Sequence, residues 1–114
     1  MNILVTGSLG FVGSHLAKRY HYQGHNVVGI DNGVGGYDDN LTEVQTYKID
    51  CCVQSNLDNL FAKNNFDLVI HAACTAYEGL SVVSPVFVTR NTYDATVNVL
   101  TVAIKHNVKK FVYM

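Results

Sequence analysis

A turn built from three glycines near the start of the chain constrains the fold more than any other feature. The glycines lie in the run Val-Thr-Gly-Ser-Leu-Gly-Phe-Val-Gly-Ser-His-Leu, which spans residues 5–16. An apolar run, residues 3–5, precedes the turn, and a helical pattern follows it. A buried strand, a tight turn and a helix N-terminus in this order form a cradle for phosphate groups, because the free N–H groups and the dipole of the helix attract anions.

An acidic residue closes the next apolar run and completes the pattern. Asp31 follows residues 27–30, where a dinucleotide-binding unit places a carboxylate for the hydroxyls of the adenosine ribose. In such a unit the first glycine permits the turn, the second lets the backbone approach a pyrophosphate, and the third lets the helix pack against the strand. A glycine-rich turn alone is common in structural loops, but the strand, turn, helix and acid together predict a dinucleotide site.

The composition indicates one folded domain. The chain has 114 residues, of which 48% are hydrophobic and 15% charged, so we expect a packed core. A formal net charge of −1 offers no basic surplus for a nucleic-acid backbone. No apolar run approaches a membrane span and no signal peptide is recognised, so we expect a cytoplasmic protein with neither membrane nor nucleic-acid partners. The three cysteines are expected to be free and buried.

Short apolar runs alternate with helical patterns along the chain. Strands are expected at residues 2–6, 26–31, 46–50, 66–71 and 111–114. Helices are expected at residues 11–23, 56–64 and 86–107, the second of them capped by Ser55, with loops over residues 32–44 and 72–85. This alternation predicts an α/β fold of the Rossmann type, a doubly wound parallel sheet with strand order 3-2-1-4-5.

The glycine turn differs from the usual dinucleotide fingerprint by one residue. Its spacing is Gly-x-x-Gly-x-x-Gly, and residues 6–13 resemble the signature Thr-Gly-x-x-Gly-Phe-[Ile/Val]-Gly of the extended short-chain dehydrogenase/reductase family. This family includes NAD-dependent nucleotide-sugar epimerases and dehydratases. The resemblance covers the whole chain, because residues 71–74 match the family's His-x-Ala-[Ala/Gly] and further matches occur at Pro85, Asn91, Thr96 and Asn98, with alanine at position 95 in place of a glycine.

The resemblance implies which residues hold NAD. The family uses the acid after the third strand and its neighbour for the adenine, and small residues after the fourth strand near the riboses. The implied cofactor-binding residues of this chain are Gly7, Gly10, Phe11, Val12, Gly13, Asp31, Asn32, Asp50, Cys51, Ala72, Ala73, Cys74 and Asn91. The only arginines, Arg19 and Arg90, are remote in sequence from Asp31, which would repel a 2′-phosphate, so we expect NAD rather than NADP.

No residue of the chain can be assigned the family's catalytic role. The family transfers protons with a Tyr-x-x-x-Lys pair, and none of the seven tyrosines has a lysine four positions later. We therefore expect residues 1–114 to be the incomplete NAD-binding domain of a nucleotide-sugar epimerase or dehydratase, without its catalytic segment and substrate domain, and to be inactive alone. The alternative is a non-catalytic NAD(P)-binding regulatory or sensor module.

The remaining polar residues favour structural interpretations. Histidines 15, 21 and 25 are expected at an exposed helix end rather than on a metal, and His71 is expected to be packed rather than to act as a general base. Residues 38–39 are expected to form an acidic turn. Residues 111–114 are expected to form an edge strand and Met114 not to be the natural terminus, so we expect marginal stability and association between copies through this strand.

Overall fold

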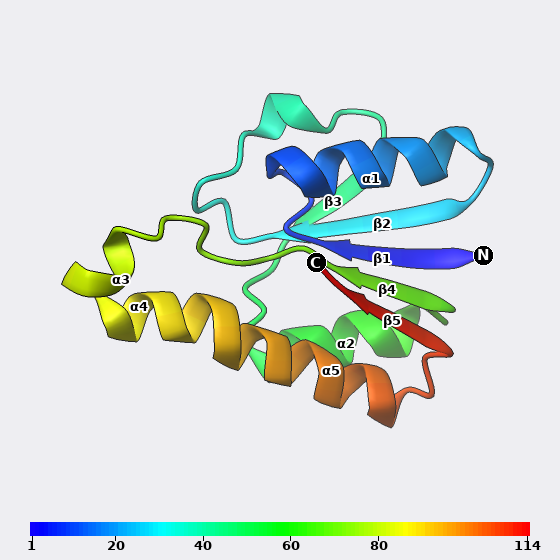
Figure 1. The fold of residues 1–114 in the computed structure, drawn as a ribbon. Helices are drawn as coiled ribbons and strands as arrows, with labels where there is room; N and C mark the ends of the chain where they lie inside the picture. Colours follow the sequence, from blue (N-terminus) through cyan, green and yellow to red (C-terminus); the bar gives the residue numbers. More distant parts are fainter.

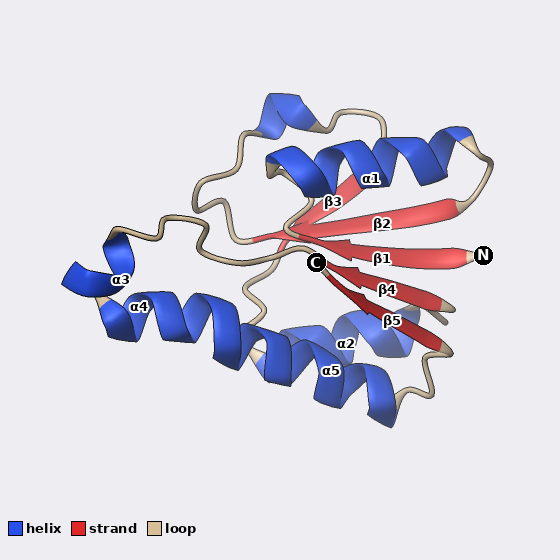
Figure 2. Ribbon diagram, viewed as in Figure 1, coloured by secondary structure: helices blue, strands red, loops and turns tan.

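The computed structural model describes all 114 residues and contains one parallel sheet between two layers of helices (Figures 1 and 2). Its strands are β1 (Asn2–Thr6), β2 (Asn26–Asp31), β3 (Gln45–Lys48), β4 (Leu68–His71) and β5 (Lys110–Tyr113). They pair in the order β3-β2-β1-β4-β5, all parallel, which confirms the predicted topology and places β3 and β5 at the edges. Thr6 at the end of β1 pairs with both Ile30 and His71, so the carboxyl ends of the central strands meet at one edge.

The helical elements cover both faces of the sheet. They are α1 (Phe11–Tyr22), η1 (Asp38–Asn40), α2 (Gln54–Lys63), α3 (Leu80–Val83), α4 (Pro85–Thr89), η2 (Arg90–Asp94) and α5 (Ala95–Lys105). In Figure 1, α1 lies on one face of the sheet, and α2 and α5 lie on the other. The chain therefore changes faces between β3 and β4, as a doubly wound sheet requires.

Alternate residues of β1 contribute to two hydrophobic clusters, one on each face of the sheet. Leu4 belongs to the cluster that includes residues of α2 and α5, whereas Ile3 and Val5 belong to the cluster that includes Ala17 of α1. Successive side chains of a strand point to opposite faces. Because both faces are covered, the side chains of Ile3, Leu4 and Val5 are all fully buried. This burial explains why the sequence of the strand is an unbroken apolar run.

The helix expected to begin after a Ser55 cap has a different start. It begins at Gln54, with Val53 at the cap position and no side-chain cap hydrogen bond. The preceding turn supplies the reason, because the Asp50 carbonyl accepts from the Val53 N–H at 3.0 Å and the Asp50 carboxylate accepts from the Cys52 N–H at 2.8 Å. This turn leads directly into the helix and leaves Ser55 exposed inside its first turn.

The long helix expected over residues 86–107 is a continuous helical path from Pro85 to Lys105 with an unpredicted π-helical turn, η2, in its middle. Pro85 occupies the first turn of α4, where its missing N–H removes no helical hydrogen bond. The loop expected over residues 72–85 contains the short helix α3. π-Helical turns often mark functional sites, and η2 lies between α4 and α5. None of the helices has both the length and the apolar composition that a membrane crossing needs.

Candidate functional site

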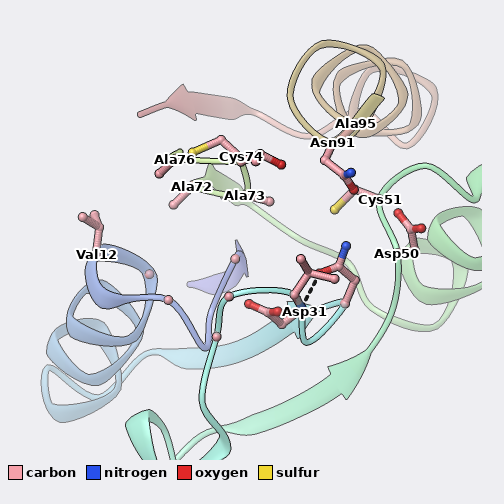
Figure 3. A pocket seen from close by; sticks show the side chains of 18 of the residues that line it. Val12, Asp31, Asp50, Cys51, Ala72, Ala73, Cys74, Ala76, Asn91 and Ala95 are labelled. Atoms are coloured by element: carbon pink, nitrogen blue, oxygen red, sulfur yellow. Dashed lines mark hydrogen bonds between the residues drawn. The ribbon is translucent and has the colours of Figure 1, made fainter. Parts of the chain in front are cut away.

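A pocket of about 330 Å³ lies at the carboxyl edge of the sheet (Figure 3). In Figure 3, Val12 on α1 lies across the pocket from Asp50, and Asp31 lies beside the glycine turn. The structure brings together all of the residues that the sequence assigned to the cofactor: Gly7, Gly10, Phe11, Val12, Gly13, Asp31, Asn32, Asp50, Cys51, Ala72, Ala73, Cys74 and Asn91. The segments that follow four strands and the turn η2 thus share one cavity.

The three glycines of the turn have different physical roles. Gly7 has a φ of +65°, and a Cβ there would lie 2.8 Å from the backbone of Ala72 and Ala73, so a side chain is excluded by both strain and space. A Cβ on Gly13 would lie 2.1 Å from the Gly7 carbonyl oxygen. A Cβ on Gly10 would meet only that same oxygen, at 3.3 Å. Gly7 and Gly13 are therefore required by the fold, whereas Gly10 mainly keeps the pocket side of the turn open.

The first turn of α1 offers anion-binding groups to the pocket. Phe11, Val12 and Gly13 line the cavity at the start of the helix, where backbone N–H groups lack partners within the helix. Gly10 adopts an extended conformation at the cap position and contributes no side-chain cap. The N–H groups and the positive end of the helix dipole therefore remain available to a bound phosphate.

Asp31 has a structural role that the sequence did not reveal. Its side chain is buried, with Oδ2 accepting from the Leu9 N–H at 3.0 Å and Oδ1 accepting from the Gly33 N–H at 2.8 Å. The carboxylate therefore ties the glycine turn to the end of β2. Each oxygen keeps a further lone pair, so the same group can also accept hydrogen bonds from a ligand. Next to it, the Asn32 side chain accepts from the Val34 N–H at 2.9 Å and closes a local turn.

The segment after β3 borders the opposite end of the pocket. Asp50 accepts from the Cys52 N–H through Oδ1 and from Arg90 Nη2 through Oδ2, at 2.8 and 3.2 Å. Cys51 is buried, and its burial, reinforced by the charge of Asp50, raises the pKa of the thiol to about 12. Its carbonyl accepts from Asn98 Nδ2 at 3.2 Å. Cys51 is thus an apolar wall residue rather than a nucleophile.

The three cysteines are free, as predicted, but they do not share one environment. Cys51 is buried, Cys52 is half-buried and Cys74 is exposed, so the expectation that all three are buried is wrong for two of them. Burial and the Asp50 carboxylate raise the pKa of the Cys52 thiol to about 11. Cys74 is exposed because it follows β4 in the loop that borders the pocket, beyond the cover of both helical layers.

His71 is completely buried at the end of β4, which supports the packed interpretation. Its Nδ1 lies 2.7 Å from Thr6 Oγ1, and its Nε2 lies 3.0 Å from Thr96 Oγ1. Burial lowers the pKa of the imidazole from 6.5 to about 4, so the ring is neutral at pH 7. A neutral, buried ring fully engaged with two hydroxyls has no free nitrogen to act as a general base on a ligand.

The direction of each hydrogen bond around His71 follows from its neighbours. The Thr96 hydroxyl donates its one proton to the Thr92 carbonyl at 2.6 Å, so it must accept from His71 Nε2–H. His71 Nδ1 is then the unprotonated nitrogen and accepts from the Thr6 hydroxyl, which in turn accepts from the Ala73 N–H at 3.2 Å. The neutral imidazole therefore connects the pocket segment after β4 to the turn η2.

The turn η2 carries Asn91 to the pocket. Asn91 is half-buried and donates through Nδ2 to the Phe87 carbonyl at 2.9 Å, and its neighbour Thr92 accepts from the Thr75 N–H at 3.3 Å. Its side-chain oxygen accepts no hydrogen bond from the protein and can serve a ligand. The π-helical geometry inserts one residue into the helix and so changes which side chains face the pocket.

Sequence reasoning missed several residues of the cavity wall: Val34, Gly35, Gly36, Ile49, Thr75, Ala76, Tyr77 and Ala95. Most of them follow β2 or β4, so their distance from a strand end was the available signal. Tyr77 is the largest, and a Cβ on Gly35 would lie 3.1 Å from its hydroxyl, so the loops after β2 and β4 approach each other here. No group of three or more His, Cys, Asp or Glu side chains is arranged to hold a metal ion.

A family model and the similar curated proteins indicate the same family for this chain. The model of the NAD dependent epimerase/dehydratase family matches residues 3–114. UDP-glucose 4-epimerase of Caenorhabditis elegans is 33% identical to the chain over 129 residues, and that of Halalkalibacterium halodurans is 35% identical over 113 residues. Both alignments cover 99% of this chain, but only 37% and 34% of the relatives, so the chain spans about a third of their length.

Solved structures agree with this result. The structure of UDP-glucose 4-epimerase from Thermotoga maritima with UDP-glucose has a TM-score of 0.96 at 31% identity, covering 99% of this chain and 37% of that one. The Thermus thermophilus enzyme in complex with NAD has a TM-score of 0.92 at 28% identity, covering 97% and 36%. The likeness therefore extends over nearly the whole of this chain.

Proposed function

The chain belongs to the NAD-dependent epimerase/dehydratase family, and from this premise we propose that residues 1–114 form the NAD-binding part of a nucleotide-sugar epimerase. The observation that carries the proposal is the pocket, in which every residue assigned to the cofactor from the sequence lines the same cavity. The similarity to UDP-glucose 4-epimerases, one of them in complex with NAD, supports the same cofactor here.

The glycine turn and the carboxylates fit a dinucleotide. Space that a Cβ on Gly10 would fill remains open beside the N-terminus of α1, as close approach of a pyrophosphate requires. Asp31 has lone pairs left for ribose hydroxyls, and Asp50 and Cys51 would border the adenine. Neither Arg19 nor Arg90 lines the pocket, and Asp31 would repel a 2′-phosphate, so the site favours NAD over NADP.

Bound NAD would supply the hydride acceptor and donor for the sugar, while the residues of this chain bind and orient it. The walls formed by Ala72, Ala73 and Cys74 are small, so they leave room where the cofactor passes β4. The proton-transfer groups of the family are not among these residues, because no tyrosine here has a lysine four positions later. We propose UDP-linked sugars as the substrate class, since the similar relatives are UDP-glucose and UDP-arabinose 4-epimerases.

Titration calorimetry of the 114-residue chain with NAD and NADP tests the cofactor assignment. We expect NAD to bind at least about tenfold more tightly than NADP. This factor corresponds to a loss of about 1.4 kcal/mol of binding free energy where the 2′-phosphate of NADP meets Asp31. Gly10→Ala is expected to keep the circular dichroism spectrum of the wild type, because its Cβ would meet only one backbone atom of the protein. It is expected to lose NAD binding, because the same Cβ would fill the space that the pyrophosphate needs. A folded wild-type chain that does not bind NAD, or a Gly10→Ala chain that binds it equally well, would contradict the proposal.

A further inference from the structure

The helix that contains η2 holds three consecutive residues of the loop between β3 and α2. Arg90 Nη2 donates to Asp50 Oδ2 at 3.2 Å, and the Cys52 thiol donates to the Arg90 carbonyl at 3.1 Å. Further along the same helical path, Asn98 Nδ2 donates to the Cys51 carbonyl at 3.2 Å. Residues far apart in sequence thus fix the loop that closes one end of the pocket.

Asp50 is the charged acceptor of this loop at the pocket wall. Its side chain is 29% exposed and lines the cavity, whereas the Arg90 side chain is 51% exposed and lies outside it. The Cys52 N–H occupies one lone pair of Oδ1 and Arg90 occupies one lone pair of Oδ2, so each oxygen retains another. The two protein donors fix the plane of the carboxylate, and this plane determines where the remaining lone pairs point.

We propose that Arg90 is a positioning residue that acts through Asp50 and sets the nucleobase preference of the pocket. The proposal rests on the proposed function, in which Asp50 borders the adenine. The 6-amino group of adenine donates hydrogen bonds and suits a fixed carboxylate, whereas the 6-oxo group of hypoxanthine presents lone pairs to the same oxygens. An Asp50 carboxylate held by Arg90 therefore accepts a 6-aminopurine and disfavours a 6-oxopurine.

Arg90 can be replaced without loss of the fold. Its ion pair with Asp50 is solvent-exposed, and such pairs contribute little to stability. The contact from Cys52 is made to the Arg90 carbonyl, so it remains in any side-chain variant. Arg19 provides a matched control, because it is exposed on α1, lies outside the pocket and forms no ion pair.

The first measurement compares NAD with nicotinamide hypoxanthine dinucleotide by titration calorimetry. One hydrogen bond to a charged group is equivalent to about tenfold in affinity, so the wild type is expected to prefer NAD by about that factor. Arg90→Met is expected to reduce the preference to about threefold or less, Arg90→Lys to restore part of it, and Arg19→Met to leave it unchanged. An unchanged preference in Arg90→Met overturns the proposal. So does an increased one, because the guanidinium itself would then be the donor to the 6-oxo group.

The second measurement needs no ligand. The Cys52 N–H donates to Asp50 Oδ1, so its hydrogen exchange in the free chain reports how firmly the carboxylate is held. Arg90→Met is expected to accelerate this exchange about threefold and Arg19→Met to leave it unchanged. Equal exchange in the wild type and Arg90→Met overturns the positioning role. If the wild type binds neither dinucleotide, the proposed function and the base preference both fail, whereas the exchange result still decides whether Arg90 positions Asp50.

Discussion

Mild acid is expected to destabilise this fold through one buried histidine. His71 is fully buried, and its two ring nitrogens contact Thr6 and Thr96. The rings of Phe111 and Tyr113 lie 6.0 Å away between centroids, and burial alone accounts for the lowered pKa. Protonation of Nδ1 would place a charge in this environment and remove the acceptor for the Thr6 hydroxyl.

The sign and size of the effect follow from the two pKa values. Because the pKa falls from 6.5 to about 4 on folding, the unfolded chain binds a proton at His71 between these values and the folded chain does not. The contribution of the neutral imidazole to stability is therefore complete above pH 6.5 and is lost as the pH falls towards 4. At 1.36 kcal/mol for each pH unit, the total loss is about 3 kcal/mol.

Urea unfolding of the wild type and of His71→Asn at pH values from 7.5 to about 4 measures this contribution. Asn can still accept from Thr6, but it does not titrate, so its free energy of unfolding should depend less steeply on pH. We expect His71→Asn to be less stable than the wild type by about 2 kcal/mol at pH 7, and the two curves to meet near about pH 5 and to cross below it. His71→Gln, which can still donate to Thr96, should behave in the same way. Parallel curves for the wild type and both variants would refute the assignment of a neutral, buried His71.

Two further substitutions and one labelling experiment test the site. Gly13→Ala should destabilise the chain by about 3 kcal/mol or more in urea unfolding, because its Cβ would lie 2.1 Å from the Gly7 carbonyl oxygen; stability equal to wild type would show that the turn adapts. Asp31→Ala should lower stability by about 2 kcal/mol, because the Leu9 N–H loses its buried acceptor, and should also reduce the preference for NAD over NADP in titration; an unchanged urea midpoint would contradict the first effect. Of the three thiols, only Cys74 should react rapidly with a thiol reagent at pH 8, and NAD should slow it; rapid labelling of Cys51, whose pKa is raised to about 12, would contradict its burial.

The topology and the position of the pocket could be predicted because they depend on local patterns. Apolar runs alternating with helical patterns determine a parallel sheet, and right-handed crossovers leave few possible strand orders. The glycine turn after β1 and Asp31 after β2 follow strand ends, and parallel strands bring these ends to one edge. Residues after β3 and β4 reach the same edge, and there the resemblance to the dehydrogenase/reductase family implied which of them hold the cofactor.

Only the tertiary structure decided the contacts between segments that are distant in sequence. The Asp50–Arg90 pair, the Asp31–Leu9 hydrogen bond and the His71–Thr96 hydrogen bond each join residues whose partners no local pattern specifies. The exposure of Cys74 and the π-helical turn η2 were likewise not predicted from local patterns. The sequence alone predicted which segments reach the carboxyl edge, since strand ends are encoded locally. Packing between layers decided how those side chains are held, because the direction of a carboxylate or the tautomer of an imidazole depends on donors and acceptors that only folding brings near.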